Sequence, residues 1–200
     1  MKDAVQMIDT REAILDATDR LLARFGYRKM TVDDLAKETG IGKGTVYLYF
    51  PSKEEIALSH IDRIVERLIA KLQEIAEGPG TAEQKLLKML LERVIFRFDS
   101  VQNYTQGLND LLAELRPKLL ERRRRYFDEE ASVIAAVIVE GQTDGRFVTR
   151  DAVEIAQTLL SATNSLLPYS LSVIELGDRT EVEKQARRIA ELLIRGLNIE

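Results

Sequence analysis

The sequence predicts an all-α fold of about nine helices. Apolar residues recur at the spacing of three and four that an amphipathic helix requires, and runs of strict two-residue alternation are absent. Four hydroxyl residues are each followed, three positions later, by an acid or an amide, which is the pattern of a helix capping box. These pairs are Thr31/Asp34, Ser52/Glu55, Thr81/Gln84 and Thr180/Glu183.

Glycine and proline mark most of the expected helix ends. Gly26 and Gly40 close the first two helices, and residues 78–80 (Gly-Pro-Gly) separate the fourth helix from the fifth. Pro117 is expected to open the seventh helix, because proline suits a first turn, and residues 141–145 form a turn. The expected helices are 11–25, 31–39, 43–50, 53–77, 82–98, 104–115, 117–140, 151–167 and 181–197.

Composition excludes several classes of function. There is no cysteine, which rules out disulfides and thiolate metal sites and fits a reducing cytoplasm. With His60 as the single histidine, no metal or other cofactor is expected. The longest apolar run, Val133–Val139, is shorter than the roughly 20 residues of a membrane span, so a cytoplasmic protein without a membrane partner is expected.

The charge is distributed unevenly along the chain. The whole sequence carries a formal net charge of -4. Between Arg20 and Lys53, seven basic residues stand against three acids, a local net charge of +4. A basic segment on an acidic body is typical of a small DNA-reading domain attached to a larger one.

The basic segment contains a helix-turn-helix pattern. Residues 25–53 read FGYRKMTVDDLAKETGIGKGTVYLYFPSK, in which two short helices flank residues 39–42. At 100° per residue, Val46 and Phe50 fall on the inner side of the second of these helices, where they are expected to pack against Leu21, Phe25, Leu35 and Ala36. Gly44, Thr45 and Leu48 fall on the opposite side, and Lys43, Tyr47 and Tyr49 lie on its flanks. A helix with one apolar and one polar edge suits the major groove of double-stranded DNA.

This stretch resembles the DNA-binding head of the TetR family of bacterial repressors, strongly over residues 11–58. The remaining helices resemble the family in architecture, and residues 192–197 (LLIRGL) also look family-like. The resemblance implies a DNA-binding domain over residues 1–53 and a ligand-binding and dimerisation domain over 54–200. It implies a homodimeric, non-enzymatic repressor that binds a palindromic operator and is released by a small-molecule inducer.

The resemblance also implies roles for single residues of the head. Thr31, Tyr49 and Lys53 would contact phosphates, and Gly44 would allow close approach of the backbone. Lys43, Thr45, Tyr47 and Leu48 would face the major groove. The alternatives are that Tyr47 and Tyr49 are core aromatics and that Lys43 and Lys53 are ordinary solvated charges.

Two sets of residues are candidates for function in the body. Each residue has the alternative of ordinary core or surface packing. The candidate ligand pocket contains apolar residues and a few polar groups: His60, Ile64, Met89, Arg93, Phe96, Tyr104, Leu108, Tyr126, Phe127 and Asn164. The candidate dimer interface is a four-helix bundle: Ala156, Leu159, Leu160, Thr163, Ala186, Ile189, Ala190, Leu193 and Leu197.

Other functions fit the sequence less well. Residues 40–45 resemble a phosphate-binding nucleotide loop, but a helix rather than a strand is expected before them, and Lys37 stands where that loop needs glycine. A helical enzyme is disfavoured, because the sequence contains no evident pair of a nucleophile and a base. A DNA-binding module without an inducer remains a rival. Residues 122–125, four arginines, precede three acids and are expected to form a solvated, ion-paired face.

Overall fold

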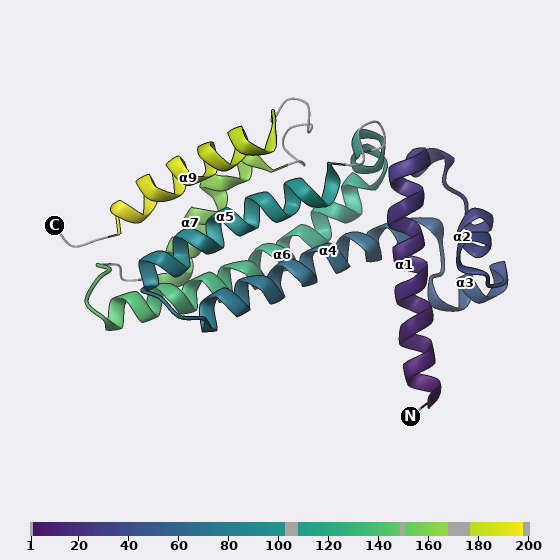
Figure 1. Cartoon of the computed structure of the whole chain (residues 1–200), viewed down its shortest axis with the longest axis horizontal. Helices are drawn as coiled ribbons and strands as arrows, with labels where there is room; N and C mark the ends of the chain where they lie inside the picture. The colour runs from purple at the N-terminus through teal and green to yellow at the C-terminus, as the bar shows by residue number, and fades with distance from the viewer. Residues whose placement is uncertain (1, 103–107, 149–150, 168–176, 198–200) are drawn as a thin grey trace. The chain divides into compact units, whose positions relative to one another are not determined.

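The computed structural model describes residues 2–102, 108–148, 151–167 and 177–197, and no β-strand occurs among them. The all-α prediction is confirmed (Figure 1). No helix in these ranges has the length and apolarity needed to cross a membrane. The helices are α1 (Lys2–Lys29), α2 (Val32–Thr39), α3 (Lys43–Tyr49), α4 (Lys53–Glu77), α5 (Ala82–Val101), α6 (Leu108–Thr143), α7 (Ala152–Thr163), the 3-10 helix η1 (Asn164–Leu166) and α9 (Arg179–Arg195).

Most helices begin where side chains satisfy their first backbone amides. Three of the four predicted pairs make the expected side-chain bond at a helix start: Thr31/Asp34, Ser52/Glu55 and Thr81/Gln84. The prediction that Thr180 and Glu183 cap a helix is wrong. Asp178 caps α9 instead, and its carboxylate accepts a 3.0 Å hydrogen bond from the Glu181 amide. A carboxylate is as good a cap as a hydroxyl and adds a favourable charge at the positive end of the helix.

The chain divides into two compact units. We call the unit of Met1–Ile64 and Asn103–Leu119 the head unit, and the unit of Val65–Gln102 and Leu120–Glu200 the body unit. The predicted boundary between a DNA-binding domain (1–53) and a ligand-binding domain (54–200) divides the chain by function, whereas these units divide it by packing. The functional boundary therefore stays a prediction.

Two expectations about the helices are wrong. The predicted helices 104–115 and 117–140 are parts of one helix, α6, which contains Pro117. Pro117 removes one backbone hydrogen bond from the helix. The helix nevertheless continues beyond Pro117, and Leu115, two residues before the proline, is buried. Phe25 is 41% exposed instead of packing in the core. The backbone turns at Gly26, with φ of 73°, and the chain buries Tyr27 and Met30 after that turn.

In the body unit, α5 packs along α9, and α7 contacts both helices (Figure 1). The main core consists of aliphatic residues such as Leu86, Leu90, Ile134 and Leu160. Phe147 lies directly over Gly141, where a β-carbon would overlap the aromatic ring. The end of α6 therefore requires glycine for packing.

A buried polar cluster crosses this apolar core. The guanidinium of Arg93 donates to Glu130 (2.7 Å), Thr163 (2.8 Å) and Asn164 (2.7 Å). Arg97 also forms an ion pair with Glu130. Burial raises the pKa of Glu130, but the charges and hydrogen bonds of Arg97 and Arg93 outweigh that effect, and the net shift is downward. The carboxylate therefore stays ionised inside the protein.

We expect Glu130→Gln to lower the free energy of unfolding by about 3–5 kcal/mol at neutral pH, because it leaves two buried guanidinium groups without their carboxylate. Since the folded pKa of Glu130 is lowered, its contribution is complete above the ordinary glutamate pKa of about 4.3 and is lost as the pH falls through the folded value. Urea unfolding as a function of pH measures both effects.

The matched control is Glu129→Gln. Glu129 is exposed and pairs with Arg125 at 3.6 Å, so we expect a change within about 0.5 kcal/mol. Equal stability of the two variants would show that the buried cluster does not hold the body together.

Candidate nucleic-acid interface

The turn between α2 and α3 depends on one glycine. Gly40 adopts a left-handed conformation, with φ of 69°, that residues with a β-carbon rarely accept. Its amide donates to the carbonyl of Lys37 (3.3 Å), and the amide of Ile41 donates to the carbonyl of Ala36 (3.0 Å). These bonds close α2 and turn the chain directly into α3, as the helix-turn-helix pattern predicted.

The inner edge of α3 anchors it to the head unit. Val46 is fully buried and Phe50, the residue that ends the helix, is 2% exposed. On α2, Leu35 and Ala36 are also buried, and α2 packs against both α1 and α3. The predicted inner side of α3 is confirmed, with Phe25 as the exception.

The outer edge of α3 lies open to solvent. Lys43 and Gly44 are exposed, the Tyr47 side chain is 45% exposed and Leu48 is 84% exposed. Tyr47 is therefore not a core aromatic. Two further candidates, Thr45 and Tyr49, are half-buried. The roles of all six residues on DNA stay predictions.

Two predicted phosphate contacts have partners within the protein. The Thr31 hydroxyl is exposed and bonds to Asp34, which lowers the pKa of Asp34. The Lys53 ammonium donates to the carbonyl of Arg28 (3.3 Å) and lies 4.4 Å from the centre of the Tyr27 ring. Burial lowers the pKa of Lys53, against a smaller opposite effect of a neighbouring acid. One of the three donors of this ammonium is thus used within the head.

Sequence reasoning missed the role of an acid beside α3. The Asp33 carboxylate accepts a 2.8 Å hydrogen bond from the Lys43 ammonium. This bond and the charge of Asp33 raise the pKa of Lys43. The helix-turn-helix pattern could have predicted this ion pair, because the loop at residues 40–42 brings the start of α2 beside the first residue of α3.

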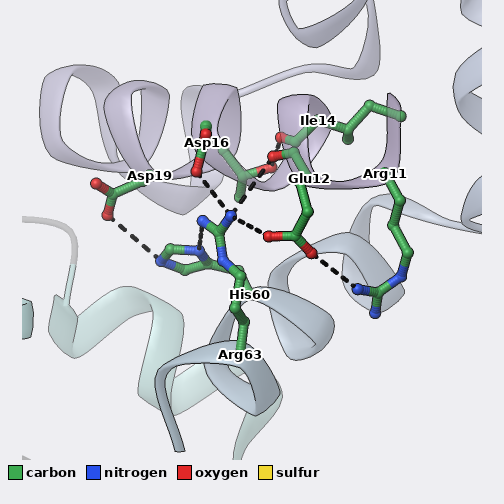
Figure 2. A network of polar contacts seen from close by, with 8 residues as sticks. Arg11, Glu12, Ile14, Asp16, Asp19, His60 and Arg63 are labelled. Carbon is green, nitrogen blue, oxygen red and sulfur yellow. Dashed lines mark hydrogen bonds and ion pairs between the residues drawn. The ribbon is translucent and has the colours of Figure 1, made fainter. Parts of the chain in front are cut away.

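His60 belongs to a polar network that joins α1 to α4 (Figure 2). The Arg63 guanidinium donates to the carboxylates of Glu12 (3.1 Å) and Asp16 (2.7 Å). His60 lies between Arg63 and Asp19, 3.4 Å from each. Since arginine has only donors, the His60 Nδ1 atom facing it acts as the acceptor. The His60 side chain is buried beside α1 in this structural role, and its part in a pocket wall stays a prediction.

The other pocket candidates are divided between the two units. Ile64 is half-buried in the head unit. In the body unit, Met89 is buried in the main core, Phe96 and Phe127 pack at its edge, and Tyr126 is buried. Arg93 and Asn164, 71 residues apart in sequence, share a hydrogen bond. Tyr104 and the side chain of Leu108 lie outside the described residues.

Most dimer candidates are buried within a single chain. These residues are at most 7% exposed within the single chain, so they already pack inside it, and their role in a dimer stays a prediction: Ala156, Leu159, Leu160, Thr163, Ala186, Ala190 and Leu197. The structure uses them for packing between α5, α7 and α9. Ile189 and Leu193 are half-buried. Periodicity located the apolar stripes correctly, but it does not distinguish packing within a chain from packing between chains.

Comparison with known proteins gives the family. Residues 14–59 match the model of "Bacterial regulatory proteins, tetR family". The head of the chain is therefore that of the TetR family. Together with the curated relatives, this match indicates a DNA-binding transcriptional regulator of the TetR type, and the expected resemblance is confirmed.

Three similar proteins illustrate the relationship. EthR of Mycobacterium tuberculosis is 42% identical over 78 residues, which span 38% of this chain and 36% of EthR. The fatty acid metabolism regulator of Bacillus subtilis is 24% identical over 92% of this chain and 94% of its own length. The structure of Bacillus subtilis FadR in complex with stearoyl-CoA has a TM-score of 0.66 and 22% identity, and the match covers 94% of this chain and 99% of the FadR chain. Among these three proteins, identity is therefore higher over the short match than over the matches that span nearly the whole chain.

We expect Gly44→Ala to separate folding from DNA binding in this family member. A β-carbon at position 44 meets no atom within 4 Å, and alanine favours helix over glycine by up to about 1 kcal/mol. The free energy of unfolding should therefore stay equal or rise. A methyl group on the outer edge of α3 should nevertheless weaken binding to a selected DNA duplex about tenfold, the loss of roughly one base contact.

Thermal unfolding and fluorescence anisotropy measure the two quantities on the same sample. Parental DNA affinity in Gly44→Ala would mean that DNA does not approach this position.

Proposed function

We propose that the chain is a ligand-responsive repressor that binds a palindromic operator as a homodimer and is released by a small-molecule inducer. Its head would insert α3 into the major groove. Lys43, Thr45, Tyr47 and Leu48 would face the bases, and Thr31, Tyr49 and Lys53 would contact phosphates. A bound repressor dimer would block a promoter by occupying it.

One observation carries this proposal: the two edges of α3 differ completely in burial. Val46 and Phe50 are inside the head, whereas Tyr47 and Leu48 expose aromatic and aliphatic surface to solvent. Exposed large apolar groups are a cost in a free protein unless a partner covers them. A thymine methyl group and the base edges of the major groove offer such a partner.

Dimerisation has a geometric motive. Two recognition helices about one turn of DNA apart read a palindrome that one helix alone reads weakly. The burial pattern favours an interface on the outer rather than the inner sides of α7 and α9. There, Leu192 is 72% exposed beside half-buried Ile189 and Leu193, and Val153 is exposed on α7.

The body unit supports a response to a ligand. Its core is apolar but contains the charged cluster of Arg93, Arg97 and Glu130, and such a combination is usual in sites for small molecules. The FadR structure holds stearoyl-CoA, so a long-chain acyl-CoA is the first inducer class to test. The inducer would need to bind a conformation with misaligned heads more tightly than the DNA-bound conformation, and α4, which contributes residues to both units, would transmit the change.

The proposed function is tested by selecting duplexes from a random DNA library with the purified protein. We expect selected sequences with two-fold symmetry. Tyr47→Ala and Thr45→Ala should each reduce the preference for the selected duplex over scrambled DNA by about 1–3 kcal/mol. Lys53→Ala should weaken binding to both duplexes alike and reduce the salt slope by about one.

Lys88→Ala is the matched control, since it removes an exposed lysine from α5 in the body unit, away from the proposed interface, and it should leave both affinities unchanged. Sedimentation of the complex gives the number of chains per duplex. Parental discrimination in both the Tyr47 and Thr45 variants would refute the assignment of α3 to the major groove.

The inducer hypothesis predicts that stearoyl-CoA lowers the affinity of the protein for the selected duplex. Titration into the protein–DNA complex measures the effect, with coenzyme A alone and stearate alone as controls for the two parts of the molecule. A twofold loss requires only about 0.4 kcal/mol of differential binding to the two conformations. If acyl-CoA compounds bind the protein without changing its affinity for DNA, a different inducer class or a constitutive DNA binder replaces this hypothesis.

A further inference from the structure

An acidic side chain lies at the edge of the surface proposed to meet DNA. The Asp33 carboxylate, in the first turn of α2, is 57% exposed and forms an ion pair with Lys43, which is 50% exposed and begins α3. A carboxylate beside a DNA-binding surface repels phosphates at short range. Its charge favours the positive end of α2, but the capping box of Thr31 and Asp34 does not need it, and its bond to Lys43 extends its effect to α3.

The ion pair limits where the Lys43 ammonium can go. Lysine carries its charge on a flexible four-carbon stem, and a free ammonium beside DNA binds whichever phosphate is nearest. Phosphate contacts strengthen binding to any sequence and carry no sequence information. Held by Asp33, the ammonium stays near the outer edge of α3, which begins with Lys43. From that edge, lysine can donate to guanine O6 or N7.

We propose that Asp33 is a positioning residue that acts through Lys43 and sets how strongly the head prefers a specific sequence over DNA in general. This inference rests on the proposed function, because it assumes that the outer edge of α3 meets the bases. Exposed ion pairs are weak, worth at most about a fivefold factor in an equilibrium constant. The expected effect on specificity is therefore modest and measurable.

The test compares Asp33→Asn with the parent protein on two DNA duplexes of equal length and composition. One is selected by the parent from a random library, and the other is its scrambled sequence. The substitution keeps the shape of the side chain and releases Lys43 from the ion pair. We expect affinity for the scrambled duplex to rise about three- to fivefold and its salt slope to steepen by about one, since one more ammonium binds phosphate. Affinity for the selected duplex should rise less, so that the ratio of the two affinities falls about threefold.

Glu38→Gln is the matched control within the same head. Glu38 pairs with Arg20 at 2.9 Å, with side chains 37% and 56% exposed, and the pair joins α1 to α2 without involving α3. Its removal adds the same charge to the head as Asp33→Asn. A general electrostatic effect should therefore appear equally in both variants and on both duplexes, and only Asp33→Asn should change the affinity ratio.

Two further variants identify Lys43 as the residue through which Asp33 acts. In a Lys43→Gln background, Asp33→Asn should leave the affinity ratio unchanged, and Asp33→Glu in the parent should preserve discrimination. A ratio that changes equally in Asp33→Asn and Glu38→Gln, or that changes as much without Lys43 as with it, overturns the inference. If the parent itself shows no preference for any duplex, the proposed function fails and the inference fails with it. If the parent discriminates and Asp33→Asn keeps its ratio, only the inference fails.

Discussion

A helix of seven residues cannot maintain its shape alone in water, because the first hydrogen-bonded turn costs more conformational entropy than it returns. α3 therefore depends on the contacts that bury its inner edge, above all those of Val46 and of Phe50 at its end. The left-handed turn at Gly40 fixes the direction in which α3 leaves α2. With the inner edge committed to folding, only the outer edge is available for recognition. The function assigned to this head follows from that division.

Each unit also contains an arginine buried among acceptors from other helices. In the head unit, Arg63 of α4 binds acids of α1, and in the body unit Arg93 of α5 binds Glu130 of α6. Such buried ion pairs add little net stability, since desolvation offsets most of their attraction. Their geometry is nevertheless demanding, because sliding either helix by one turn separates the charged atoms. We interpret them as fixing the register of helix pairs, which apolar contacts alone specify less strictly.

The sequence predicted those features that depend on neighbouring residues. The caps at Thr31 and Thr81, the turn at Gly40 and the two edges of α3 all follow from local chemistry, and the structure contains each of them. The errors concern features that depend on distant surfaces. α6 continues through Pro117 although the local signal is a helix start. His60 is buried beside Asp19 of α1, a contact that no local pattern reveals.

Long-range packing also explains the outcome for the body unit. An apolar stripe on a helix indicates that other side chains pack against it. The stripe alone does not tell whether these side chains belong to the same chain or to a second chain. Leu159 and Leu160 are covered by their own chain, so a second chain that packed on α7 and α9 would have to contact their opposite, more polar side. The pocket candidates have the same ambiguity, although two of them, Arg93 and Asn164, are joined directly by a hydrogen bond.

The charges of the head indicate that DNA recognition depends more on specific contacts of α3 with the bases than on a general attraction to phosphates. The segment from Arg20 to Lys53 has a net charge of +4, yet several of its cations are held by acceptors of the head itself. Arg20 pairs with Glu38, Lys43 with Asp33, and the Lys53 ammonium bonds to a backbone carbonyl. Because these partners compete with phosphates for the same cations, the general attraction to DNA is weaker than the count of basic residues suggests. A head of this kind gains most where α3 meets a base sequence that fits it, and the restraint on its cations is then a source of specificity.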